Sequence, residues 1–257
     1  MRRLLFLPAL FLASAAASQD TDGECTDRPY TSGPSFCEMR EVALPARDTV
    51  RVDGGPNGSV AVRAWSGSGV RVRARVRTYG PTEAAARRRA EAVEIQTDGT
   101  IRAADVGRAE GGRWGSLEVL VPHGTAVDVA TVNGSITVEG VSDWVRLASQ
   151  NGSLRLEDVG GDVRGRTANG SLTVVLTEST WYGAGLDLET ANGSVRVVVP
   201  DGYNAQLATA TRWGRVTNDT GVPFTTENGR DLALTLGAGG PLLRAVTTNG
   251  RVSVTRG

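Results

Sequence analysis

The chain of 257 residues carries 28 basic and 28 acidic residues, so its net charge of zero does not favour nucleic acid or an acidic membrane as a partner. Hydrophobic residues make up 40% of the chain, which is enough for a buried core and argues against disorder. The 33 glycines and the aromatic content of 5% favour many turns and small-residue packing over a helical bundle.

Residues 1–17 are predicted to be a secretory signal peptide. Arg2 and Arg3 form a positive start, residues 4–12 are apolar but too few to span a bilayer, and residues 15–17 offer a small-residue cleavage site. No later run is long and apolar enough for a transmembrane helix. We therefore expect a soluble, exported bacterial protein of the periplasm, the cell surface or the extracellular space, with no transmembrane segment after signal removal.

Residues 18–44 are rich in Gly, Pro and Ser and are predicted to be a flexible segment that contains both cysteines. Cys25 and Cys37 can pair in an oxidising compartment and close a short loop. The alternative is a metal-binding or catalytic thiol pair, but two cysteines without a nearby histidine make a poor metal site. The sequence thus predicts a Cys25–Cys37 disulfide, no metal and no other cofactor.

Residues 45–124 are predicted to form a β-rich N-terminal cap. Alternating residues in "TVRVDGG" and "VRVRARVRTYG", between residues 48 and 80, indicate strands, as does "GSLEVLVPHG" at residues 115–124. A short helix is predicted at 82–93, because Pro81 and Thr82 precede a run of Ala, Arg and Glu. We expect the cap to pack on the first repeat, with its helix over an open edge or face.

Residues 125–257 repeat the phrase "TANGSLTV" of residues 167–174. Apolar residues alternate on both sides of each turn, which indicates a strand, a turn and a second strand. Asn-Gly suits a tight turn because both residues tolerate positive φ. A hydroxyl residue two positions before each turn shares the parity of the apolar residues, so it should point inward and bond to turn backbone. The predicted structural turn residues are Asn133, Gly134, Asn151, Gly152, Asn169, Gly170, Asn192, Gly193, Asn249 and Gly250, with Trp213-Gly214 as a variant copy.

One such unit buries too few aliphatic side chains to fold alone, so the units are expected to stack. The favoured architecture is an all-β, single-stranded β-solenoid in which like residues of successive coils lie over one another. The alternative is an antiparallel β-meander in which each Asn-Gly closes a hairpin. Similar residues at the same corner, with insertions tolerated between them, favour the solenoid.

Residues 45–257, with the export signal, the strand-rich front with one helix and the serial "T-x-N-G-S" units, resemble a bacterial adhesin-like family of unknown function. This family is related to the so-called head domains of autotransporter adhesins. The resemblance implies a β-solenoid-like fold and a location in the bacterial envelope or at its surface. It supplies no catalytic motif.

Several side chains are candidates for catalysis or ligand binding. Paired carboxylates could support polysaccharide cleavage, and the candidates gather near strand ends: Glu139, Asp143, Glu157, Asp158 and Asp162. Acidic residues at such positions also serve solubility and edge protection. The single histidine, His123, lies in "VPHG", a strand exit typical of a turn residue. Trp181 and Tyr182, in the insertion "ESTWYGAG", are the predicted binding surface, because protruding loops carry function more often than coils.

The sequence therefore predicts an exported, non-enzymatic repeat protein of the bacterial envelope that acts in adhesion or scaffolding, with no catalytic residues. An envelope polysaccharide or protein is the expected partner. The alternative is a carbohydrate-active enzyme, a polysaccharide lyase or hydrolase, on the same frame.

Overall fold

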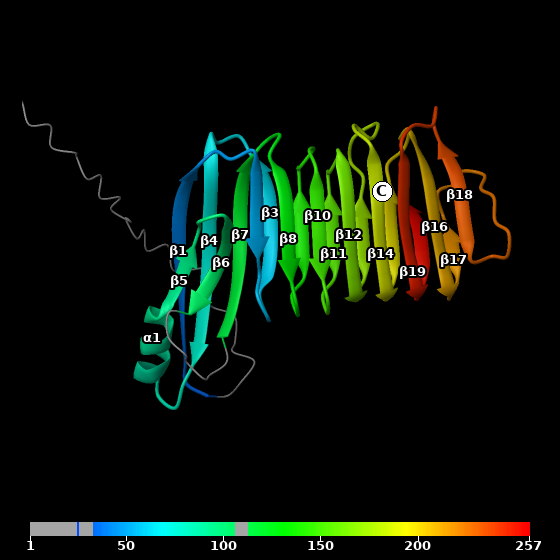
Figure 1. Ribbon diagram of the computed structural model, residues 1–257. Helices are drawn as coiled ribbons and strands as arrows, with labels where there is room; N and C mark the ends of the chain where they lie inside the picture. The colour runs from blue at the N-terminus through cyan, green and yellow to red at the C-terminus, as the bar shows by residue number, and fades with distance from the viewer. Residues whose placement is uncertain (1–24, 26–32, 106–112) are drawn as a thin grey trace, which may run out of the picture.

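The computed structural model describes Cys25, residues 33–105 and residues 113–257. These residues form two ten-stranded mixed sheets that face each other in an elongated stack, with one short helix at one end (Figure 1). The predicted all-β class is confirmed. The predicted signal peptide at residues 1–17 lies outside the described residues, among which no helix is long and apolar enough to cross a membrane.

The two sheets are named A and B. Sheet A consists, in spatial order, of β1 (Ser35–Pro45), β4 (Gly69–Tyr79), β7 (Arg113–Pro122), β3 (Ser59–Trp65), β9 (Ile136–Glu139), β11 (Leu154–Glu157), β13 (Leu172–Val175), β15 (Val195–Val199), β20 (Val252–Arg256) and β17 (Val216–Asn218). Sheet B consists of β18 (Asp231–Leu236), β16 (Ala205–Trp213), β19 (Leu242–Asn249), β14 (Gly185–Asn192), β12 (Asp162–Asn169), β10 (Val145–Ser149), β8 (Ala126–Thr131), β2 (Thr49–Asp53), β6 (Thr100–Asp105) and β5 (Val93–Gln96).

Each repeat unit contributes one strand to each sheet. In sheet B, β8, β10, β12 and β14 pair in parallel, so that Val127, Val145, Val163 and Leu186 occupy one row. In sheet A, β9, β11, β13 and β15 pair in the same way. The two strands that flank an Asn-Gly turn therefore lie in different sheets and do not pair with each other. The antiparallel meander, in which each turn would close a hairpin, is wrong for these units.

The spatial order of the units departs from their order in the chain at one place. β19 lies between β14 and β16 in sheet B, and β20 lies between β15 and β17 in sheet A. The later unit is thus inserted between two units that precede it in sequence. Beyond it, β18 pairs antiparallel with β16 and forms one edge of sheet B.

The core lies between the two sheets and consists mainly of Val and Leu. Alternate residues of the strands in the repeat units are buried, as in the pattern of β10, because successive side chains of a strand point to opposite faces. β-branched side chains suit this half-buried pleated surface, and each fully buried aliphatic side chain contributes roughly 1.5–3 kcal/mol. Shared burial between neighbouring units accounts for the stability that one unit lacks.

The front strands continue both stacks. β2 pairs in parallel with β8, and β3 pairs in parallel with β9, so residues 49–65 have the arrangement of a repeat unit. β4 and β7 pair antiparallel and extend sheet A toward β1. The division into a cap (45–124) and a repeat array (125–257) stays a prediction, although a repeat-like unit already lies within the first part.

The single helix of the described residues, α1 (Glu83–Glu91), is close to its predicted bounds. The Thr82 side chain caps its N-terminus by accepting a hydrogen bond from the backbone N–H of Ala85. The helix ends before the predicted boundary because Val93 begins β5. α1 packs against β1 and β4, where Val76, Ala90 and Val93 form a small second core.

Candidate functional site

The Asn-Gly corners form a ladder of asparagine side chains along one edge of the stack. Except at Asn57, which only accepts, each amide Nδ2 donates to the Oδ1 of the asparagine in the neighbouring layer, over N–O distances of 2.7–3.1 Å. The ladder consists of Asn57, Asn133, Asn151, Asn169, Asn192 and Asn249, and Trp213 occupies the next position. The amides of the inner layers thus bond to one another and hold the layers in register.

Glycine is required at these corners for a different physical reason from the predicted one. Neither they nor the asparagines adopt positive φ, so the argument from left-handed backbone is wrong here. A Cβ added at Gly152 would instead come closer than 3.0 Å to the carbonyl oxygen of Gly134, and the other corner glycines have equivalent contacts with the neighbouring layer. Glycine is required because the layers approach one another too closely for a side chain.

The hydroxyl row lies just inside the ladder. Thr131, Thr167, Thr190, Thr211 and Thr247 are buried, as their parity predicted. Each hydroxyl of the row donates to the carbonyl oxygen of the glycine in the adjacent layer, for example Thr167 Oγ1 to Gly152 at 2.8 Å. Ser149 donates to Gly134 in the same way, at 3.0 Å. Together with the asparagines, these bonds engage the polar side chains of this corner in contacts between layers.

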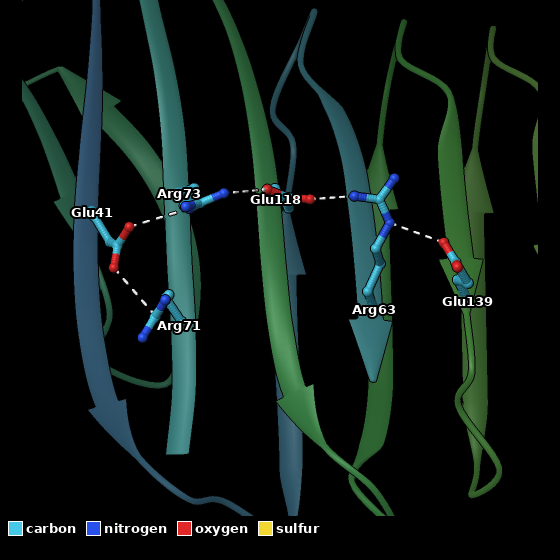
Figure 2. Close-up of polar contacts among 6 residues, drawn as sticks. All are labelled: Glu41, Arg63, Arg71, Arg73, Glu118 and Glu139. Carbon is cyan, nitrogen blue, oxygen red and sulfur yellow. Dashed lines mark hydrogen bonds and ion pairs between the residues drawn. The ribbon is translucent and has the colours of Figure 1, made fainter. Parts of the chain in front are cut away.

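A network of ion pairs crosses the outer face of sheet A at the front of the stack (Figure 2). Glu41 of β1 lies 3.2 Å from both Arg71 and Arg73 of β4. Arg73 continues to Glu118 of β7 at 3.6 Å, and Glu118 also pairs with Arg63 of β3. These residues, together with Glu139, are called the charged face of sheet A below.

The network ends at Glu139 of β9, which accepts a hydrogen bond of 2.9 Å from Arg63 Nε. This bond raises the pKa of the Arg63 guanidinium above its ordinary value, and the bond to Glu41 does the same for Arg73. The side chains of Arg63 and Arg73 are 46% and 41% exposed. Five neighbouring strands thus present a flat, solvent-facing array of both charges.

No family model and no curated protein matches the sequence. Among solved structures, a "putative cell adhesion protein" from Clostridium sporogenes is 9% identical, with a TM-score of 0.48 over 87% of this chain and 100% of that one. A "putative adhesin" from Bacteroides fragilis is 9% identical, with a TM-score of 0.44 over 86% and 97% of the two chains. A "putative lipid binding protein" from Parabacteroides distasonis is 10% identical, with a TM-score of 0.32 over 87% and 97%.

The carboxylates that the sequence offered for catalysis do not converge on one site, because most of them bond to different partners. Glu139 pairs with Arg63, Glu157 with Arg155 at 2.7 Å, and Asp162 with Arg164 at 3.2 Å. Asp143 accepts a hydrogen bond from the backbone N–H of Trp144. Among the described residues, no three His, Cys, Asp or Glu side chains converge to hold a metal ion. Asp162 lines a pocket over β12, β14 and β19, and Asp158 lines another pocket.

That pocket, called the corner pocket below, lies at the corner opposite the asparagine ladder and has a volume of about 330 Å³. His123, Asp158, Glu178, Tyr182 and Tyr203 line it, from connections that belong to different layers. Burial raises the pKa of the Tyr203 phenol to about 12, and the negative charges of Glu178 and Asp158 add to the shift. The phenol therefore stays protonated at neutral pH.

The predicted binding surface is divided by the structure. Trp181 is only 3% exposed, because its indole packs in the core and donates to the carbonyl oxygen of Gly161 at 3.1 Å, so it is not accessible to a ligand. Tyr182 is 65% exposed at the rim of the corner pocket. Glu178, from the same insertion, and Tyr203, which follows after a complete strand pair, line this pocket with Tyr182.

The predicted Cys25–Cys37 disulfide is present, and it joins Cys25 to β1. A structural disulfide is typical of proteins in an oxidising compartment.

Proposed function

We propose that this protein is an exported, non-enzymatic, adhesin-like or scaffolding protein of the bacterial envelope that engages its partner through the charged face of sheet A. The single observation that carries the proposal is the ion-pair network that spans β1, β4, β7, β3 and β9. It presents guanidinium and carboxylate groups in fixed positions over a flat area. Such a face fits a broad polar partner, an envelope polysaccharide or protein, better than a small substrate.

The frame of this surface is, in our proposal, a β-solenoid of Asn-Gly units with an N-terminal cap. The in-register parallel pairing and the asparagine ladder support that assignment. A solenoid suits adhesion or scaffolding because stacked layers give a rigid, extended surface.

The distribution of apolar side chains also supports a polar interface. The large hydrophobic residues exposed among the described ones are Val132, Tyr182, Trp213, Phe224 and Leu242, and none belongs to a strand of sheet A. Association through the charged face would thus depend on charge-assisted hydrogen bonds, which are strong individually and weaken with salt.

The test is cosedimentation of the purified protein with isolated bacterial envelope polysaccharide and, separately, envelope protein, at low and high salt. We expect binding to at least one fraction, and we expect the triple substitution R63Q, R71Q and R73Q to weaken it roughly tenfold or more. The matched control removes three arginines from the outer face of sheet B, by R146Q, R164Q and R244Q, and should bind like wild type. Equal loss in both variants would reject the charged face as the site, and no binding to either fraction would reject adhesion.

The alternative function, a carbohydrate-active enzyme, is favoured by one observation, the two carboxylates Asp158 and Glu178 in the corner pocket. Polysaccharide turnover by the wild type that is lost in Asp158→Ala would support it. Glu157→Ala is the comparison, because Glu157 pairs with Arg155 and is not part of the pocket lining. Absence of turnover across a polysaccharide panel would favour the non-enzymatic proposal.

A further inference from the structure

The corner pocket contains polar groups that the protein itself leaves unused. The Tyr203 side chain is 3% exposed and lines the pocket, yet its hydroxyl takes part in none of the hydrogen bonds among the described residues. The hydroxyl is not among the fully buried polar atoms that lack a partner, so it faces the open space of the pocket rather than the core. It is therefore free to donate a hydrogen bond to a ligand in the pocket.

The acceptors of the pocket are similarly available. Thr177 Oγ1 donates to Asp158 Oδ1 at 2.6 Å, which fixes the carboxylate and leaves Oδ2 without a protein donor in the described part of the chain. The Glu178 carboxylate has no hydrogen bond or ion pair there either. Asp158 is also the one non-glycine residue at positive φ among the described residues, with φ of 53°. Strained backbone of this kind clusters at functional sites.

The charge of the lining restricts the class of ligand. Two carboxylates and no arginine line the pocket, so an anionic ligand such as a uronate or a phosphate would be repelled. A metal ion is disfavoured, since no three metal-ligating side chains converge in the described structure. A simple polyamine would satisfy the carboxylates but offers no acceptor to the Tyr203 hydroxyl.

A sugar that carries a free amine meets all these conditions. Its ammonium group can form charge-assisted hydrogen bonds with Asp158 and Glu178, and its hydroxyls can accept from Tyr203. Tyr182, 65% exposed at the rim, offers an aromatic face for the apolar side of a sugar ring. The volume of about 330 Å³ is at the lower end of the range of small-ligand sites.

We infer that the corner pocket binds an amino sugar, through Asp158 and Glu178 as acceptors, Tyr203 as a donor and Tyr182 as a stacking platform. The site is separate from the charged face of sheet A. It serves to recognise a partly deacetylated glycan at the edge of the stack, whether or not the charged face engages a partner.

The test is isothermal titration of the full protein with three probes, a glucosamine trimer, its N-acetylated counterpart and a galacturonate trimer. We expect the glucosamine trimer to bind about tenfold or more tightly than the N-acetylated one, and the galacturonate trimer not to bind. Failure of the glucosamine trimer to bind, or equal binding of the galacturonate trimer, would overturn the inference.

Conservative variants locate the binding. Glu178→Gln should weaken it about tenfold and Tyr203→Phe several-fold, with no loss of unfolding midpoint, because neither group bonds to the protein. Tyr182→Ala should weaken binding and Tyr182→Phe should retain it. Glu189→Gln, an equal change of charge on the exposed side of β14 and outside the pocket, is the control and should bind like wild type.

The two proposals can fail independently. The triple arginine variant of the charged face should bind the glucosamine trimer like wild type, even where it loses envelope binding. Binding of the trimer that is unaffected by the Glu178, Tyr203 and Tyr182 variants would place the amino-sugar site elsewhere and overturn the inference.

Discussion

Replacing Gly152 with alanine tests the physical reason for the Asn-Gly corners. The added Cβ would come closer than 3.0 Å to the carbonyl oxygen of Gly134, so the two layers must separate locally. That movement strains the bonds of Ser149 to Gly134 (3.0 Å) and of Thr167 to Gly152 (2.8 Å), as well as the amide bonds of Asn151.

The expected cost follows from these contacts. Loss of two hydrogen bonds contributes about 1–3 kcal/mol and overpacking adds about 1–3 kcal/mol, so Gly152→Ala should lower the free energy of unfolding by about 2–6 kcal/mol. Gly229→Ala is the matched control. Gly229 also follows an asparagine, but it has φ of 74° and open space around it, so alanine there costs about 1–2 kcal/mol of left-handed strain.

Urea unfolding followed by circular dichroism compares the two variants with wild type. The reasoning requires the larger loss at Gly152, although a rule based on positive φ would place the larger loss at Gly229. Equal losses, or a larger loss in Gly229→Ala, would refute the argument from close approach.

Three further predictions concern other parts of the molecule. Asn151→Ala removes one donor and one acceptor from the ladder and should cost about 1–2 kcal/mol in the free energy of unfolding, measured by urea titration; an unchanged midpoint would show that the ladder adds nothing. The folded-state pKa of Tyr203, about 12, exceeds its ordinary value of about 10, so stability present below pH ~10 should fall by up to about 2–3 kcal/mol as the pH rises to ~12. Tyr203→Phe should not show this loss in the free energy of unfolding at alkaline pH. Parallel pH profiles of the two proteins would contradict the assignment of the loss to Tyr203. Glu118→Gln should cost less than about 1 kcal/mol, and the loss should shrink with added salt in thermal melts, because the pairs with Arg63 and Arg73 are solvent-facing; a large, salt-independent loss would argue against that account.

The strand periodicity allowed much of the fold to be predicted from the sequence. Alternation around each Asn-Gly located the strands, and the parity of Thr167 and Thr190 placed their hydroxyls inside the corner, where they lie. The spatial position of β19 and β20 could not be predicted, because all units carry the same apolar pattern and any of them fits beside any other. Which units become neighbours then depends on how well their strands pack in the folded stack, and the local sequence pattern does not contain that information.

The front repeat and the corner pocket show two other limits of prediction from the sequence. Asn57 lacks the hydroxyl residue two positions before it, since Gly55 stands there, so its unit was missed although its amide oxygen accepts from Asn133. The pocket joins Asp158 to Tyr203, which lies 45 positions later in the chain, and no spacing rule connects them. The sequence pointed to it only through two separate features, the insertion that carries Tyr182 and the candidate carboxylate Asp158.

The insertion of β19 and β20 between earlier units has a consequence for assembly. If the layers folded one after another in the order of synthesis, folding would have to stop after β15. The layer that lies next in space, β19 and β20, is synthesised last. Residues 205–256 must therefore collapse onto the growing end in a concerted step. When the molecule is pulled by its ends, this region should accordingly unfold in one event that releases a long extension of chain. The remaining layers should then unfold in a series of shorter extensions.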